Sequence, residues 1–125
     1  MQITHATFVT LPVTDQDRAK EFYAGALGFE VVADRQAGPV RWVQVAPKGA
    51  QTSFTLATAD QLGLQPGSVS GLMLETADLD GDCAELTRAG IAVEGPQDLP
   101  WGRQATLADP DGNGLILSEK PASAR

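Results

Sequence analysis

The two halves of the chain repeat the same order of residues with a displacement of 63 positions. Asp15 returns as Asp78, and each acid precedes an amphipathic segment in the manner of a helix N-cap. The other positions that return with the same residue type are Leu11, Asp17, Pro47 and Gly49, as Leu74, Asp80, Pro110 and Gly112. A duplicated unit of this length restricts the fold to two copies of one module packed against each other.

Each copy reads as strand, helix and three strands, because apolar residues alternate in the strands and recur every three or four positions in the helices. Gly28 and Gly90 end the two helices. The predicted elements of the first copy are strand 6–13, helix 16–27 and strands 29–34, 40–46 and 51–57. Those of the second copy are strand 71–76, helix 79–89 and strands 91–94, 103–109 and 113–119.

The sequence therefore predicts an α+β fold in which two βαβββ modules form a curved mixed sheet around a cleft. A helix covers only one face of each sheet, so the other face is left for a ligand or a partner. We expect one domain over residues 1–125, with modules at about 3–57 and 69–119. Gly, Pro and Ser mark residues 58–70 as the linker, and residues 120–125 read as a frayed tail.

The charge and cysteine content exclude several classes of function. A net charge of −7 argues against nucleic acid as a partner and favours a cationic ligand. No apolar run approaches the length of a membrane span, and the N-terminus lacks the features of a secretory signal. Cys83 is the single cysteine, so no disulfide framework is possible and we expect a cytoplasmic protein.

Two stretches carry a family resemblance: FVTLPVTDQDRAKEFYAGALGFEV in the first half and PWGRQATLADPDGNGLILSE in the second. Together they resemble the vicinal oxygen chelate superfamily, which contains glyoxalases, bleomycin-resistance proteins and extradiol dioxygenases. The resemblance implies the glyoxalase/bleomycin-resistance fold and a homodimer. It does not decide between binding and catalysis, because both occur on this fold.

Metal-dependent members of this family hold a divalent ion with His and Glu side chains of the first and last strands of each module. The resemblance places these ligands at Phe8, Thr55, Gly71 and Ile116, and none of these residues offers an imidazole or a carboxylate. His5 is the only histidine, and strand alternation turns it away from the face that Phe8 occupies. We therefore expect no metal and no other cofactor. A metal site rebuilt around His5 or the Glu75 carboxylate stays open as an alternative.

Strand alternation predicts which side chains face the cleft. Aromatic, apolar and a few polar groups share that face, which suits a flat organic ligand. The predicted ligand-binding residues are Phe8, Thr10, Trp42, Gln44, Thr55, Met73, Glu75, Ile116 and Ser118. Trp101 and Arg103 join them on the resemblance alone, because the P-W-G-R loop of bleomycin-resistance proteins lies beside the ligand groove. The alternative is that this widespread motif only orders the loop.

Two functions follow from this set of residues. The favoured one is a metal-free protein that sequesters an aromatic drug or metabolite, which can be cationic. The alternative is an enzyme of the same family: a metal-dependent lyase or dioxygenase, or a metal-free isomerase or cyclase in which Glu75 is the general base. The sequence contains no pairing of a nucleophile with a base, so no catalytic residue is predicted for the first function.

Overall fold

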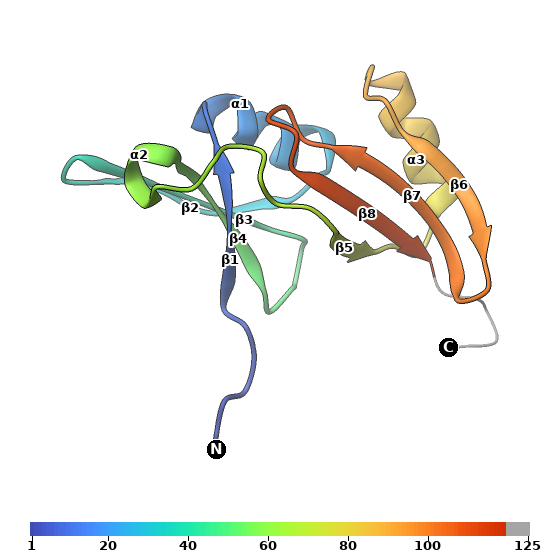
Figure 1. Cartoon of the computed structure of the whole chain (residues 1–125), viewed down its shortest axis with the longest axis horizontal. Helices are drawn as coiled ribbons and strands as arrows, with labels where there is room; N and C mark the ends of the chain where they lie inside the picture. Colours follow the sequence, from blue (N-terminus) through green and yellow to red (C-terminus); the bar gives the residue numbers. More distant parts are fainter. Residues whose placement is uncertain (120–125) are drawn as a thin grey trace.

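Each half of the chain folds into a four-stranded sheet with a helix on one side, as the sequence predicts (Figure 1). The computed structural model describes residues 1–119. The first module contains β1 (Phe8–Val13), α1 (Gln16–Lys20), η1 (Glu21–Ala26), β2 (Glu30–Ala37), β3 (Val40–Ala46) and β4 (Ser53–Thr58). The second contains β5 (Leu72–Glu75), α3 (Leu79–Arg88), β6 (Glu94–Leu99), β7 (Gly102–Ala108) and β8 (Gly114–Glu119).

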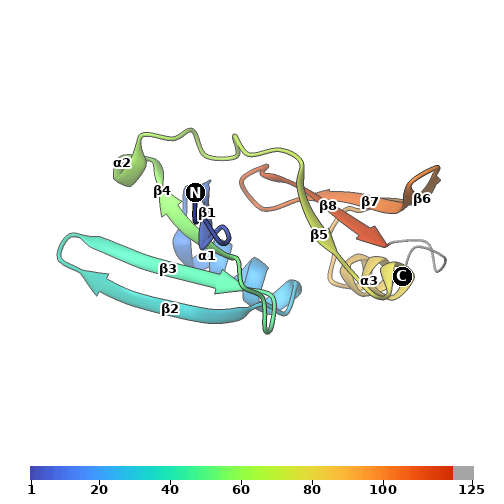
Figure 2. The same cartoon turned by 90° about the horizontal axis from the view of Figure 1, so that it is seen from below.

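The two sheets have the same strand order. The first runs β1-β4-β3-β2 and the second β5-β8-β7-β6. The first strand of each module pairs in parallel with the last strand, and the other pairs are antiparallel. Both views of the chain show the sheets side by side along its long axis, with β2 and β3 at one end and β6 and β7 at the other (Figures 1 and 2). The modules therefore do not stack face to face within one chain.

Both helices begin where the sequence places them. The Asp15 carboxylate accepts a hydrogen bond from the Arg18 amide at 3.1 Å, and the Asp78 carboxylate accepts one from the Gly81 amide at 3.0 Å. These bonds satisfy amides that the first turn of a helix leaves without partners. The first helix continues beyond Lys20 as a π-helical turn, η1. In that turn the adjacent Phe22 and Tyr23 are both buried.

One hydrophobic core joins the helix-covered faces of both sheets. The strands contribute alternate residues, as period-two patterning requires. The members below 2% exposure include Leu11, Val13, Val43, Val45, Leu56, Ala105 and Leu115 from the strands and Ala19, Tyr23 and Leu79 from the helices. These strand residues face the helices, whereas Val9, at the start of β1, is 39% exposed.

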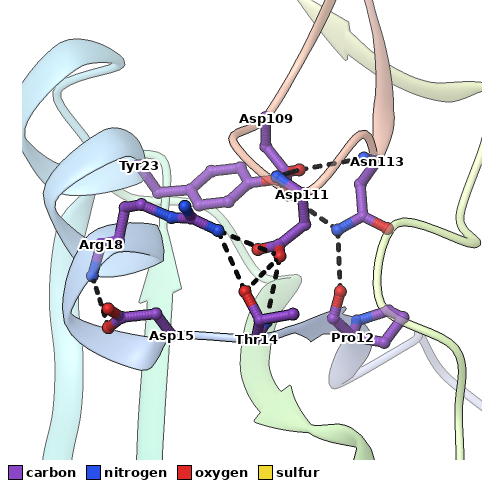
Figure 3. A network of polar contacts seen from close by, with 8 residues as sticks. All are labelled: Pro12, Thr14, Asp15, Arg18, Tyr23, Asp109, Asp111 and Asn113. Carbon is purple, nitrogen blue, oxygen red and sulfur yellow. Dashed lines mark hydrogen bonds and ion pairs between the residues drawn. The ribbon is translucent and has the colours of Figure 1, made fainter.

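The turn between β7 and β8 fastens the second module to the first (Figure 3). Asp109 accepts a hydrogen bond from the Tyr23 hydroxyl at 2.8 Å, and the Asn113 side-chain amide donates to the Pro12 carbonyl at 3.0 Å. Asp111 accepts from the backbone amide and the hydroxyl of Thr14, at 3.1 and 2.7 Å. We call this set of contacts, together with the Arg18–Asp111 ion pair, the intermodule clasp.

Three details differ from the sequence prediction. The strand expected at 91–94 begins instead at Glu94, because Ile91 and Val93 pack against the core from the loop after α3. The predicted linker contains a short helix, α2 (Ala59–Leu62). The repeat distance also shrinks along the chain, since the parallel pairs Thr10–Thr55 and Met73–Ile116 place corresponding residues of the last strands 61 positions apart. The tail predicted at 120–125 lies outside the described residues.

Candidate functional site

The open face of the first sheet carries a groove of about 210 Å³. Its floor is formed by β1, β3 and β4, and α2 borders it on one side. We call it the first-sheet groove. Its lining residues are Phe8, Thr10, Val40, Arg41, Trp42, Val43, Thr55, Leu56, Ala57 and Gln61. Four of the residues predicted to face the cleft are therefore brought together here: Phe8, Thr10, Trp42 and Thr55.

Two aromatic rings dominate this groove. The Phe8 ring meets the Trp42 ring edge to face, with centroids 5.4 Å apart and an angle of 87° between the planes. Phe8 is 43% exposed, although its side chain is large and apolar. An aromatic pair on a sheet face, with Phe8 exposed and Trp42 half-buried, offers a surface on which a flat ring can stack.

The polar groups of the groove floor are hydrogen-bonded to one another. The Thr10 and Thr55 hydroxyls lie 3.0 Å apart, and either can be the donor. Beside them the Trp42 indole donates to the Gln44 side chain at 3.0 Å, and Gln44 donates to the Ser53 hydroxyl at 2.6 Å. Gln44 thus supports Trp42 from the neighbouring position on the same sheet face. In the threonine pair, one hydroxyl hydrogen is left to donate to a ligand.

Arg41 is the one cationic residue among the described groove-lining residues, and carboxylates already pair with it. Its guanidinium contacts Asp34 at 2.9 and 3.0 Å and Asp17 at 2.7 Å. The hydrogen bonds from Arg41 and then Lys20 hold the pKa of Asp34 well below its usual range. Arg41 therefore anchors β3 to β2 and α1.

The predicted residues of the second module do not line this groove within one chain. Met73 and Ile116 are register partners on the open face of the second sheet, and Met73 is 52% exposed. Ser118 lies farther along β8, next to Glu75 in the register. Glu75 lines a different cavity, which lies between the two modules.

Trp101 and Arg103 also lie away from the first-sheet groove. Trp101 is 66% exposed in the turn between β6 and β7, at the far end of the second sheet (Figure 1). Arg103 donates to Asp80 at 3.0 Å and to Asp98 at 3.0 Å, and it lies 3.4 Å from Glu119. Glu119 in turn accepts from the Leu79 amide at the start of α3. Arg103 is thus a structural link between β7 and α3.

The side chains at the expected metal-ligand positions do not suit a divalent ion. Phe8, Gly71 and Ile116 have no donor atom, and the Thr55 hydroxyl is bonded to Thr10. His5 is exposed and contacts its neighbour Thr4. Within residues 1–119 no three His, Cys, Asp or Glu side chains come together as a metal site. The donor set required by a metal-dependent member is therefore missing from these positions.

Gln61 lines the groove but was not predicted from the sequence. Residues 58–70 were expected to form a linker, and the helix α2 that carries Gln61 is only four residues long. The Gly63 that ends α2, with φ of +69°, was the one local signal of a helix end. No helix among the described residues is long and apolar enough to cross a membrane.

Comparison with known proteins supports the resemblance seen in the sequence. The family model for the Glyoxalase/Bleomycin resistance protein/Dioxygenase superfamily matches residues 2–117. TnmS3, an antibiotic-binding protein from Streptomyces sp. CB03234, is 47% identical and has a TM-score of 0.92, over 97% of this chain and 99% of that one.

Two further relatives extend this picture. A member of the same superfamily from Sphaerobacter thermophilus DSM 20745 is 38% identical with a TM-score of 0.88, over 94% of this chain and 98% of that one. The uncharacterized protein YetH of Bacillus subtilis (strain 168) is 31% identical over 113 residues, which cover 89% of this chain and 94% of YetH. With its paired βαβββ modules and this set of relatives, the chain belongs to the glyoxalase/bleomycin resistance protein/dioxygenase superfamily.

Proposed function

We propose that this protein binds and sequesters a planar aromatic small molecule in the first-sheet groove, without a metal ion. The observation that carries the proposal is the lining of the groove: a partly exposed Phe8–Trp42 ring pair beside a threonine pair with one hydrogen to donate. The similarity to an antibiotic-binding protein over nearly the whole chain supports binding as the activity. The net charge of −7 favours a ligand that carries a positive charge.

We further propose that the working form is a homodimer in the cytoplasm. The groove is walled by the first module and α2, and the open face of the second module exposes Met73. A second copy that places its second-module face over this groove would cover both surfaces, in a symmetric arrangement. Met73, Trp101, Ile116 and Ser118 would then reach the ligand from the second copy, whereas Glu75 lines the cavity between the modules. The single buried cysteine suits a reducing compartment.

The first test uses the two tryptophans of the chain as reporters. In the Trp101→Phe variant Trp42 is the only tryptophan, and with selective excitation of tryptophan we expect proflavine, a planar aromatic cation, to quench it in a saturable manner. Replacing Trp42 with Ala removes the stacking surface and should weaken binding, measured by calorimetry, by about tenfold or more. If Trp42→Ala binds proflavine as tightly as the parent, the groove is not the ligand site.

The absence of a metal requirement is tested on the same preparation. Protein purified without chelator is assayed for metal content and then titrated with Zn²⁺, Ni²⁺ and Mn²⁺ by calorimetry. We expect no stoichiometric ion and no heat of binding, because Phe8, Gly71 and Ile116 supply no donor atom. A stoichiometric ion would overturn the metal-free part of the proposal and would favour an enzyme.

A further inference from the structure

A second cavity lies between the two modules, on the side of the helices rather than on the open sheet faces. Its volume is about 170 Å³. The first module contributes Ala26, Leu27, Phe29 and Pro47, and the second contributes Leu74, Glu75, Thr76, Asp82, Glu85, Leu86 and Leu117. We call it the intermodule cavity. It shares no residue with the first-sheet groove.

The internal repeat explains why this cavity exists. Tyr23 lies eight residues after the cap Asp15, and Leu86 lies eight residues after the cap Asp78, so the two correspond. Asp109 directly follows β7, and Pro47 directly follows the corresponding strand β3, so the strand ends pair Pro47 with Asp109, one position short of the sequence match with Pro110. In one half of the molecule, Tyr23 and Asp109 meet in the intermodule clasp. In the other half, their counterparts Leu86 and Pro47 both line the cavity.

The turn in the first module cannot reproduce the clasp. Residues 47–52 (PKGAQT) contain no acid, whereas residues 109–113 (DPDGN) insert two carboxylates and an amide. The phenol ring of Tyr23 is also larger than the side chain of Leu86. The intermodule cavity is therefore the place of a missing second clasp.

The chemistry of the walls specifies what can fill this place. The inner part is apolar, since Leu86 and Leu117 are 4% and 6% exposed and Phe29 packs against the core. Three acidic residues line the cavity: Glu75 on β5, and Asp82 and Glu85, which are three positions apart on α3 and so share a helix face. No Lys, Arg or His is among the described residues that line the cavity.

Asp82 is held in position by a hydrogen bond from the Thr76 hydroxyl at 2.5 Å. Its charge also reaches the neighbouring Cys83, where burial first and then Asp82 and Asp80 raise the pKa of the thiol. The rim of the cavity is therefore a region of negative potential next to an apolar interior. A cavity of about 150 Å³ in another protein takes one benzene molecule, so this one has room for a single ring.

We propose that the intermodule cavity is a second ligand site, and that it binds a small arylalkylammonium ion. The ring occupies the apolar interior between Phe29, Leu86 and Leu117, and the ammonium group faces Asp82 and Glu85. Because the walls come from both modules, the bound cation bridges the modules where the chain itself has no clasp. This site is independent of the proposed function of the first-sheet groove.

The test titrates the full ¹⁵N-labelled chain with benzylammonium chloride and follows backbone amide shifts by NMR. We expect saturable shifts centred on Leu74, Thr76, Leu86 and Leu117. Benzyl alcohol, which is neutral and of the same size, should bind more weakly by about fivefold or more. Equal affinity for both compounds, or shifts centred on Trp42 instead, would overturn the proposal.

Three variants sharpen the result. Glu85→Gln should weaken benzylammonium binding about fivefold and leave benzyl alcohol unaffected, because only the charge is removed. Glu94→Gln is the control, since this exposed carboxylate in β6 does not line the cavity. Leu86→Phe fills the interior and should abolish binding of both compounds. Unchanged benzylammonium affinity in Glu85→Gln contradicts the proposal, whether or not Leu86→Phe folds.

The two ligand sites can fail separately. Trp42→Ala should weaken proflavine binding and leave the benzylammonium shifts unchanged. Leu86→Phe should do the reverse. Loss of benzylammonium binding in Trp42→Ala would show that the ion enters the first-sheet groove, and would refute the second site while leaving the proposed function standing.

Discussion

Tyr23 is the only tyrosine of the chain, and its hydroxyl is buried against a carboxylate. Burial first, and then the charge of Asp109, raise the pKa of this phenol far above its usual value of 10.0. Asp109 itself accepts four hydrogen bonds, from the Tyr23 hydroxyl, the Asn113 side chain and the amides of Asp111 and Asn113. The hydroxyl is thus a fixed donor that holds the two modules together.

Replacing Tyr23 with Phe removes this donor and leaves the carboxylate short of one partner. We expect the free energy of unfolding at pH 7 to fall by about 1–3 kcal/mol, measured by urea denaturation. An unchanged free energy would show that water or another group replaces the hydroxyl without cost.

The same residue sets the stability in alkali. Because the pKa of Tyr23 is higher in the folded state, its contribution is complete below pH 10 and is lost as the pH rises further, when the unfolded chain ionises first. The parent should therefore lose stability above pH 10 more steeply than Tyr23→Phe does. The absorbance of tyrosinate should appear only as the protein unfolds, and its appearance in the native state near pH 10 would contradict this account.

At the level of elements, the sequence predicts those helix and strand boundaries that neighbouring residues determine. The helix caps Asp15 and Asp78 and the strand Val40–Ala46 lie where the sequence placed them. The stretch 91–94 alternates like a strand, but whether it joins the sheet depends on its pairing with β7, which a local pattern does not contain. The same holds for α2, whose four residues show too little periodicity.

The candidate site was predictable only in part, for a related reason. Strand alternation placed Phe8, Thr10, Trp42 and Thr55 on one face, and these four residues line one groove because they belong to one sheet. It could not show that the open faces of the two sheets stay apart in one chain, since that depends on how the modules pack. Arg103 was assigned by resemblance to a ligand groove, but its partners Asp80, Asp98 and Glu119 come from elements far along the chain.

Arg103 gives a test of that structural role. Arg103→Lys keeps the charge but cannot form the forked contacts to Asp80 and Asp98, so the urea midpoint should fall. The difference should shrink in high salt, which screens exposed ion pairs. Proflavine affinity, measured by calorimetry, should remain that of the parent. A strong loss of affinity without loss of stability would return Arg103 to the ligand site.

At the level of the whole molecule, the two open sheet faces set the expected assembly. The first face exposes Phe8 and the second exposes Met73, and the chain itself covers neither. Burying both faces in one symmetric contact removes apolar surface from water, which is the main favourable term in protein association.

Met73→Asp places a charge on the second of these faces. We expect a dimer for the parent and a monomer for the variant in sedimentation equilibrium, together with weaker proflavine binding. Val32→Asp is the matched control, because Val32 is as exposed, at 54%, but lies on the outer strand β2. A parent that sediments as a monomer, or a control that dissociates like Met73→Asp, would rule out this interface.

The intermodule clasp is asymmetric, so the two modules of the duplicated chain are not interchangeable. The first module contributes only the receiving surface, formed by Tyr23, Pro12 and Thr14. The second contributes only the inserted turn, residues 109–113. Two first modules would both present the receiving surface and no turn to insert, and two second modules would both present the turn and no surface to receive it. If the chain were divided within the linker, the halves should therefore recognise each other and not themselves. If the two modules descend from one repeat that paired with its own copy, this asymmetry would have converted a homomeric pairing into a strictly heteromeric one.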